Sequence, residues 1–259
     1  MTTPLGPETR IHGKAWASMH GGYFSSVKKA TPLVSALRKT ALRTRPAVLA
    51  DLGGGTGFIL SQFRKSPSCR KIRLLNVDVS SKQLGQCGHP EITRVHSTVT
   101  DLRRDALMRD HDGRLMLTMR SLLHYSGGRA QWKSFLRHLR GLCKPGEYLI
   151  HQSACFETRQ DADLMSDIYR LMHTNKRFPT ISELAKLLED TGWKIEQQYP
   201  APTIFFTAVE MKDRYRFSNK NLAAIAKTIA KAKGCSAAFN SADGFTGSLE
   251  YRIFVCKAK

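Results

Sequence analysis

The stretch Ala47-Val48-Leu49-Ala50-Asp51-Leu52-Gly53-Gly54-Gly55-Thr56-Gly57 decides how this chain folds. Its first six residues are mostly apolar and predict a buried strand, which ends in a turn with almost no side chains. Glycines at such a turn let the backbone approach a ligand closely, and the N–H groups that open the following helix then face that ligand. We therefore expect a ligand-binding glycine loop over residues 53–57, with a helix behind it from Phe58 to Arg64.

The same order of apolar run, turn and helical pattern recurs through most of the chain. This alternation is typical of βα units, which build a parallel sheet with helices packed on both faces. Further strands are predicted at residues 72–77, 92–97, 115–119, 148–152 and 249–255, and one more at either 193–199 or 204–209. Helices are predicted at residues 31–42, 129–143, 160–173, 181–190 and 222–233, with a short one from residue 82. The expected fold is α/β, with a doubly wound and mostly parallel sheet of seven strands.

Two segments lie outside this alternation. Residues 1–45 precede the first strand, and we expect them to form a helical cap over the open end of the sheet. Residues 46–259 are expected to form the ligand-binding domain. Within that domain, residues 211–245 are predicted to be an insertion ahead of the last strand.

The spacing of the glycines separates the classes of nucleotide-binding protein that use such a loop. A P-loop needs the pattern GxxxxGK[ST], and no glycine of residues 53–57 is followed at that spacing by a glycine and a lysine. The dinucleotide pattern GxGxxG would need a glycine where Phe58 stands. The spacing of the glycines therefore disfavours phosphoryl transfer and a nicotinamide or flavin site.

The loop instead places an acid, Asp51, one residue before the strand end and glycine at every second position after it. This arrangement resembles motif I of the class I methyltransferases that use S-adenosylmethionine (SAM), in which an acidic residue precedes a GxGxG loop. SAM has no pyrophosphate but carries an ammonium, a carboxylate and a sulfonium, so acceptors and bare backbone suit it better than a phosphate cradle. The resemblance implies a SAM site formed by Asp51, Gly53, Gly54, Gly55 and Gly57.

A second acid, Asp78, ends the predicted second strand, where a carboxylate can accept both hydroxyl hydrogens of an adenosine ribose. An aspartate at a strand end is often only a capping residue. Paired with a glycine loop on the preceding strand, it is better explained as a ribose ligand, and its neighbour Val79 joins the site. Family members commonly hold the adenine amino group with an acid after the third strand. We assign that contact to Thr98, with Asp101 as the alternative.

Further resemblance lies downstream. Residues 142–150 are similar to the family's LxPGG segment before its fifth strand, with Glu147 replacing the second glycine, and residues 181–193 are similar to its ELxxLLxxAGF segment. The likeness covers about residues 46–200 and the last strand. Residues 1–45 and 211–245 lie outside it.

Methyl transfer from a sulfonium is an in-line displacement, so the enzyme chiefly aligns donor and acceptor and excludes water. A general base is needed only where the nucleophile arrives protonated. His124 is the candidate base, because the unperturbed pKa of histidine lies near neutrality and this residue follows the fourth strand at the edge where such sheets bind ligands. The alternative is a histidine that only packs against the loop. Tyr125 is expected to orient the acceptor.

Two further residues are assigned to the cofactor site. Arg120 ends the fourth strand, and Tyr23 belongs to a segment around Gly21-Gly22 that also contains Met19, His20 and Phe24. This segment is expected to form a flexible lid over SAM or, alternatively, the packing face of the cap.

The composition limits the class of protein. The six cysteines are scattered without a CxxC pair, so we expect reduced thiols and no metal site, and Cys87-Gly88-His89 alone is too little to bind one. No apolar run is long enough to span a bilayer, and the first 13 residues lack the apolar core of a signal peptide. A soluble cytoplasmic protein is expected.

The net charge of +20 is unevenly distributed, and both ends of the chain are basic. Residues 1–50 carry eight Lys and Arg against one acid, residues 211–259 carry ten against three, and residues 151–210 carry six against nine. Such a surface attracts anions, but the bases stand singly and form no basic run. The charge alone therefore does not decide between a nucleic-acid site and a generally basic surface.

Motifs that the chain lacks narrow the class of molecule that could accept the methyl group. Enzymes that methylate exocyclic amines of bases usually have [ND]PP[YF] after the fourth strand, where this chain has Arg120-Ser121-Leu122-Leu123. Cys155 lacks the flanking pattern of a cytosine-C5 nucleophile. We expect transfer from SAM, giving S-adenosylhomocysteine (SAH), to an O or N atom of a small molecule, and the basic ends favour an acceptor with an anionic group. An RNA-modifying methyltransferase and a SAM-binding protein without methyl transfer are the alternatives, and the oligomeric state stays open between monomer and homodimer.

Overall fold

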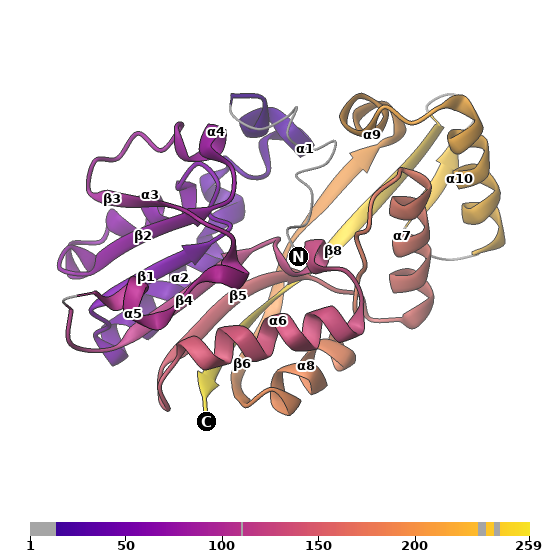
Figure 1. The fold of residues 1–259 in the computed structure, drawn as a ribbon. Helices are drawn as coiled ribbons and strands as arrows, with labels where there is room; N and C mark the ends of the chain where they lie inside the picture. The colour runs from indigo at the N-terminus through magenta and orange to yellow at the C-terminus, as the bar shows by residue number, and fades with distance from the viewer. Residues whose placement is uncertain (1–13, 110, 233–236, 241–243) are drawn as a thin grey trace.

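The computed structural model describes residues 14–109, 111–232, 237–240 and 244–259 (Figure 1). Its strands are β1 (Val48–Leu52), β2 (Arg73–Asp78), β3 (Ile92–His96), β4 (Leu115–Arg120), β5 (Tyr148–Ala154), β6 (Trp193–Thr207), β7 (Ala237–Asn240) and β8 (Gly244–Ala258). They form one sheet in the order β3-β2-β1-β4-β5-β8-β6, with β7 paired to β8 off this path. The glycine loop thus follows a strand in the interior of the sheet.

The sheet is mixed but mostly parallel. Strands β3, β2, β1, β4 and β5 pair with one another in parallel. Strand β8 runs antiparallel to β5, β6 and β7. The predicted α/β class and the mostly parallel sheet are confirmed, and the short β7 adds an eighth strand beside the continuous path of seven.

Strand β6 resolves the two alternatives for the sixth strand. Both predicted segments belong to it, except that residues 208 and 209 begin the next helix. The strand remains paired with β8 across two register shifts, one between Ile195 and Gln197 and one between Ala201 and Ile204. Pro200 lies in β6, which is an edge strand, and proline is tolerated there because the outward-facing N–H groups of an edge strand bond to no neighbouring strand.

Helices connect the strands, and two of them, α3 and α8, have the predicted bounds. The α-helices are α1 (Met19–Gly22), α2 (Val27–Thr44), α3 (Phe58–Arg64), α4 (Ser81–Leu84), α5 (Arg104–Met108), α6 (Arg129–Leu142), α7 (Arg159–Leu171), α8 (Ile181–Asp190), α9 (Ala208–Tyr215) and α10 (Asn219–Lys231). The 3-10 turns are η2 (Lys14–Ser18), η3 (Pro67–Cys69), η4 (Val99–Asp101) and η5 (Leu123–Ser126).

The core lies on both faces of the sheet, because alternate residues of a strand point to opposite sides. Leu49 and Met116 pack in one buried cluster with residues of α2 and α3. Ala50 and Leu117 pack in another with residues of α5, α6 and α8. The sheet is thereby held in place from both sides, which fixes the carboxyl ends of β1, β2 and β4.

A third buried cluster lies beyond the parallel strands. Helices α7, α9 and α10 gather around one end of β6 and β8 in Figure 1, and Tyr169, Phe206 and Tyr251 are among the buried side chains there. This cluster contains the buried apolar side chains that the structure describes between β6 and β8. It also includes Tyr23 from the segment that precedes α2.

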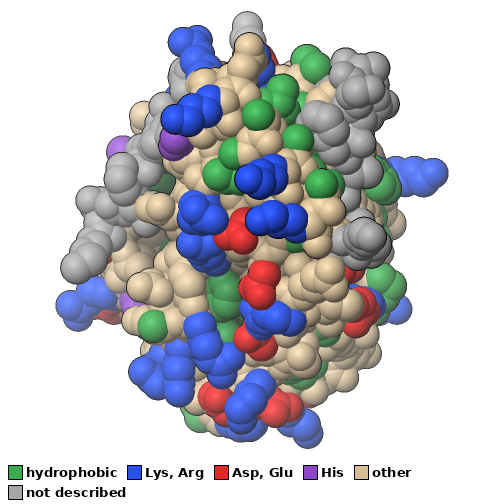
Figure 2. Space-filling model, turned by 90° about the vertical axis from the view of Figure 1, so that its right-hand side faces the viewer, with side chains coloured by type: hydrophobic (Ala, Val, Ile, Leu, Met, Phe, Trp, Pro, Cys, Tyr) green, Lys and Arg blue, Asp and Glu red, His purple; other side chains and the backbone are tan. Residues whose placement is uncertain are grey.

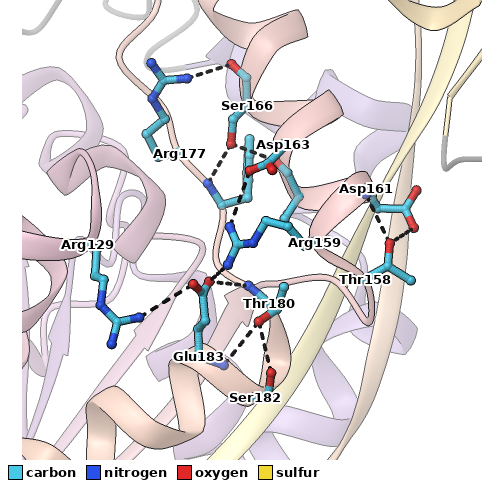
Figure 3. A network of polar contacts seen from close by, with 12 residues as sticks. Arg129, Thr158, Arg159, Asp161, Asp163, Ser166, Arg177, Thr180, Ser182 and Glu183 are labelled. Atoms are coloured by element: carbon cyan, nitrogen blue, oxygen red, sulfur yellow. Dashed lines mark hydrogen bonds and ion pairs between the residues drawn. The ribbon is translucent and has the colours of Figure 1, made fainter. Parts of the chain in front are cut away.

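The start of α8 is fixed by a capping box. The hydroxyl of Thr180 accepts from the N–H of Glu183 at 3.2 Å, and the Glu183 carboxylate accepts from the N–H of Thr180 at 3.1 Å. Glu183 also pairs with Arg129 of α6 and Arg159 of α7 (Figure 3). One carboxylate therefore ties three helices together.

None of the helices in the described residues is long and apolar enough to cross a membrane. Nor do the described side chains gather three or more His, Cys, Asp or Glu into a group that could hold a metal ion. The five cysteines within the described residues are free thiols, and all five are buried, whereas Cys235 lies outside those residues.

Candidate cofactor and acceptor site

The glycine loop adopts a backbone that requires its glycines. Gly53, Gly55 and Gly57 have φ values of 66°, 56° and 75°, in the left-handed region that side chains disfavour. At Gly54 the obstacle is space, because a Cβ there would lie 2.2 Å from the side-chain oxygen of Asn76. The loop therefore presents bare backbone above the sheet.

Three polar side chains lie in a row across the sheet beneath this loop. Asp51 of β1 is in register with Asn76 of β2 and Thr118 of β4, and none of the three is more than 1% exposed. The Asn76 amide donates to the carbonyl oxygen of Gly55 at 2.9 Å. Among the described residues, Asn76 Oδ1, Asp51 Oδ2 and Thr118 Oγ1 have no hydrogen-bond partner. Buried polar atoms are seldom left unsatisfied, so this row indicates a place where a polar ligand binds.

The carboxyl of Asp51 is chemically unusual. Its burial, together with the nearby charge of Asp78, raises its pKa to about 8, and Arg120 acts in the opposite direction. The group is therefore largely protonated at neutral pH. A cation placed against it would favour the ionised form and would gain a buried ion pair in return.

Asp78 joins the end of β2 to the glycine loop. Its Oδ2 accepts from the N–H of Gly55 at 2.9 Å, and its Oδ1 accepts from the N–H of Ser80 at 2.8 Å. A carboxylate oxygen can accept more than one hydrogen bond, so both oxygens retain capacity for ligand hydroxyls. Asp78 is partly exposed, and the neighbouring Val79 side chain is exposed beside it.

The segment after β3 also reaches this place. The N–H of Ser97 donates to the carbonyl oxygen of Asp78 at 3.2 Å. The hydroxyls of Thr98 and Thr100 share a hydrogen bond of 3.0 Å, and Asp101 is exposed at the end of η4. Assignment of the adenine contact to Thr98, or to Asp101, stays a prediction.

Tyr23 and Arg120 lie together at the end of β4. The Tyr23 hydroxyl donates to the carbonyl oxygen of Pro202 at 2.5 Å and accepts from the Gln152 amide at 2.8 Å. The guanidinium of Arg120 lies 4.8 Å from the centroid of the Tyr23 ring and interacts electrostatically with Asp51. Both side chains thus connect the segment before α2 to the candidate cofactor site, and their contact with the cofactor stays a prediction.

The segment around Gly21-Gly22 is folded against the rest of the molecule. His20 is buried, and its backbone N–H donates to the Glu210 carboxylate of α9. Phe24 stacks on Trp16, with ring centroids 4.6 Å apart. These contacts favour the packing-face alternative over a detached lid.

The candidate catalytic residues occupy η5, directly after β4. His124 is buried, and its ring lies 4.6 Å from that of Tyr125 and 5.3 Å from that of Phe178. The carbonyl oxygen of His124 accepts from the N–H of Arg177 at 3.3 Å, which fixes the loop between α7 and α8 beside it. The structure brings His124 and Tyr125 together, and their catalytic roles stay predictions.

The sequence reasoning missed two buried cations next to these residues. Lys176 is 5% exposed and Arg214 is 3% exposed. The Lys176 ammonium lies 4.2 Å from the centroid of the Tyr125 ring, and Arg214 donates to the Tyr125 hydroxyl at 3.4 Å. Their local sequences are ordinary basic segments, so nothing in the neighbouring residues distinguishes them from the chain's other cations.

Asn76 and Thr118 were also missed, although the sequence carries a signal for them. Each is a polar residue inside an otherwise apolar strand, in Leu74-Leu75-Asn76-Val77 and Leu115-Met116-Leu117-Thr118-Met119. Aligning the predicted ends of these two strands, Val77 and Met119, with Leu52 would have placed both residues beside Asp51.

Comparison with known proteins gives no match to any family model and none to a curated protein. Solved structures do match. A provisionally assigned methyltransferase of Bacillus halodurans has a TM-score of 0.66 and 15% identity, covering 88% of this chain and 98% of its own. The 1,6-didemethyltoxoflavin N1-methyltransferase of Burkholderia thailandensis, solved with its substrate and SAH, has a TM-score of 0.50 and 17% identity, covering 89% of this chain and 78% of its own.

The [4+2]-cyclase SpnF matches as well, with a TM-score of 0.50 and 13% identity over 86% of this chain and 79% of its own. A shared fold can carry different reactions, so it does not specify the chemistry. The chain has the fold of known methyltransferases.

Proposed function

We propose that this protein is a SAM-dependent methyltransferase that acts on an O or N atom of a small molecule. The observation that carries the proposal is the row of buried polar side chains under a glycine loop that Asp78 joins to β2. The structural neighbours support it, because one of them was solved with SAH.

The residues present fit SAM at both ends of the molecule. The carboxyl of Asp51, with one oxygen that has no hydrogen-bond partner among the described residues, suits an ammonium. The two oxygens of Asp78 suit the ribose hydroxyls, and Gly54 leaves bare backbone between the two acids. Val79, which is 39% exposed beside Asp78, offers an apolar surface for the adenine.

When bound, SAM supplies a methyl group on a positively charged sulfur, and transfer of that group to a lone pair of the acceptor leaves the electron pair of the broken carbon–sulfur bond on SAH. His124 accepts the proton that an O–H or N–H acceptor loses. Tyr125 orients the acceptor. The buried His124 and the half-buried Tyr125 limit the access of water to the reacting atoms.

We further propose that residues 1–45 form a cap and that residues 46–259 form a domain with an insertion at residues 211–245. The contact of His20 Nε2 with Arg214, 2.9 Å apart, supports this division, because it joins the cap to the insertion near Tyr125. The buried free thiols support a reducing, cytoplasmic location.

The test is SAH formation by the intact protein incubated with SAM and pools of hydroxyl- and amine-bearing metabolites. We expect SAH to accumulate with at least one pool, and His124→Ala to slow its formation about 100-fold, as loss of a general base does. His89→Ala, which alters an exposed histidine, should leave the rate unchanged. SAM binding without SAH formation from any acceptor would instead support the alternative of a SAM-binding protein without methyl transfer.

The net charge of +20 favours a second candidate, an RNA-modifying methyltransferase. On the face shown in Figure 2, however, Lys and Arg side chains are interspersed with Asp and Glu. RNA binding through phosphate contacts weakens steeply as salt rises. An affinity for RNA that falls about 10³-fold or more between 50 and 200 mM salt would support the RNA-modifying methyltransferase.

A further inference from the structure

Two oxygen atoms of the polar row beneath the glycine loop converge on one place. A Cβ on Gly54 would lie 2.2 Å from Asn76 Oδ1 and 2.7 Å from Asp51 Oδ2. The two side chains belong to register partners on the neighbouring strands β2 and β1. Neither oxygen has a hydrogen-bond partner among the described residues. Two buried acceptors side by side are unfavourable unless a hydrogen lies between them, so this place calls for a donor.

The amide of Asn76 does not supply that donor. Its Nδ2 donates to the carbonyl oxygen of Gly55 at 2.9 Å. Turning the amide over would place Oδ1 against that carbonyl oxygen, so the glycine loop fixes Oδ1 on the side of Asp51. An amide oxygen only accepts hydrogen bonds. The hydrogen between the two side chains therefore has to come from another group.

The carboxyl group of Asp51 can supply it. A carboxyl that is 1% exposed and ionised is costly, whereas the neutral form has an O–H that donates. Burial raises the pKa of Asp51 to about 8, the charge of Asp78 adds to the shift, and Arg120 opposes it. The thiol of Cys87, which lies against Gly57, faces the row from the loop after α4. Asp51 is therefore a carboxylic acid at neutral pH, and its hydrogen needs an acceptor.

Thr118 is the other polar neighbour of Asp51 in the row. Its Oγ1 has no hydrogen-bond partner among the described residues, and it is the register partner of Asp51 on β4. A threonine hydroxyl carries a hydrogen of its own, whereas the amide oxygen of Asn76 depends on a donor. The convergence at Gly54 joins Asp51 to Asn76 and does not include Thr118. Asn76 is therefore the acceptor that the geometry favours.

We propose that Asn76 is a positioning residue of the cofactor site, whose amide oxygen accepts the carboxyl hydrogen of Asp51 until the ammonium of SAM or SAH binds there. On binding, the O–H bond of Asp51 breaks, its electron pair stays on the carboxylate, and the proton goes to solvent. The ammonium keeps its three hydrogens, so one proton leaves for each ligand bound. This inference rests on the proposed function for the ligand, but the shared hydrogen in the ligand-free protein does not depend on it.

The first experiment counts protons. Calorimetric titration of the full-length protein with SAH, in buffers that differ in ionisation enthalpy, gives the number of protons released per ligand. Because the pKa of Asp51 is about 8, we expect about one proton at pH 6.5 and about a quarter of a proton at pH 8.5. 5′-Methylthioadenosine keeps the adenosine and the sulfur but has no amino acid, so it should bind without releasing a proton. Asp51→Asn should bind SAH without release and controls for protons from other groups.

The second experiment tests Asn76 in the ligand-free protein. NMR titration of the Asp51 carboxyl carbon, assigned by its absence in Asp51→Asn, gives the midpoint of ionisation. Asn76→Ser removes the acceptor and leaves room for water, which should lower the midpoint by about one pH unit, whereas the second carboxyl in Asn76→Asp should raise it by about as much. Thr118→Val should leave the midpoint unchanged. An asparagine that only held the loop in place would not move the midpoint in opposite directions.

Three results would overturn the inference. They are SAH binding at pH 6.5 without proton release, equal release with 5′-methylthioadenosine, and a midpoint that moves in Thr118→Val but in neither Asn76 variant. Melting curves report whether each variant is folded, and the proton counts on the wild type and Asp51→Asn decide the matter if an Asn76 variant is not.

The two proposals fail separately. If SAH binds and releases no proton, this inference fails while the proposed function stands. If the Asn76 variants move the midpoint as expected and neither SAM nor SAH binds, the proposed function fails while the shared hydrogen stands.

Discussion

At the scale of single residues, the titration of Asp51 gives a pH signature of the cofactor site. Its pKa in the folded protein, about 8, is above the ordinary carboxyl value, so the stability that its protonated form contributes is lost as the pH rises toward and through 8. Binding of an ammonium needs the carboxylate. The affinity for SAH should therefore rise with pH below 8, by up to about tenfold per pH unit, and level off above it.

Calorimetry between pH 6 and pH 9 measures this profile. Asp51→Asn is the matched control, because the amide keeps the size of the side chain but cannot ionise. It should bind SAH weakly and with a flat profile. If wild type and Asp51→Asn show the same pH dependence, the ammonium does not bind at Asp51.

Gly54 tests the geometry of the loop at the same scale. An added Cβ would lie 2.2 Å from Asn76 Oδ1 and 2.7 Å from Asp51 Oδ2, so the polar row would have to move. Such overpacking costs about 1–3 kcal/mol, and Gly54→Ala should weaken SAH binding about tenfold or more. Gly88→Ala, at a position with open space around it, should bind SAH as the wild type does. Unaltered affinity in Gly54→Ala would show that the loop does not contact the ligand.

At the scale of elements, the capping box makes α8 a separate test of the fold. Thr180→Ala removes the acceptor for the N–H of Glu183 and should lower the free energy of unfolding by about 1 kcal/mol. Thr180→Ser keeps the hydroxyl and should restore most of that loss. Urea denaturation of the three proteins measures the difference. A loss of SAH affinity in the folded Thr180→Ala protein would mean that α8 is coupled to the cofactor site, which the structure does not indicate.

The helices and strands also show which element boundaries can be predicted from the local sequence. Helix α3 follows the glycine loop and α8 follows the Thr180 cap, and both begin and end where predicted, because local backbone chemistry fixes their ends. Strand β6 was predicted as two alternatives, since nothing local reveals that pairing with β8 continues through Ala201. The length of that strand is set by its partner.

At the scale of the whole molecule, some residues of the candidate site could be predicted from the sequence and others could not. Asp51, the glycines and Asp78 could be predicted because each follows a strand end, and parallel strands place their carboxyl ends at one edge of the sheet. Lys176 and Arg214 could not, because their burial depends on how the α7–α8 loop and α9 pack against η5. The cofactor side of the site is thus a property of the parallel sheet, and the acceptor side is a property of the surrounding helices.

The account depends on the claim that Asp51, the glycine loop and Asp78 together bind an adenosyl sulfonium. Calorimetric titration of the wild type and of Asp78→Ala with SAM, SAH, NAD and ATP tests it most directly, with Asp105→Ala as a control for an exposed acid. We predict that the wild type binds SAM and SAH but neither NAD nor ATP, and that Asp78→Ala, unlike Asp105→Ala, weakens SAM binding about tenfold or more. Tight binding of NAD or ATP without SAM, or unchanged SAM affinity in Asp78→Ala, would contradict it.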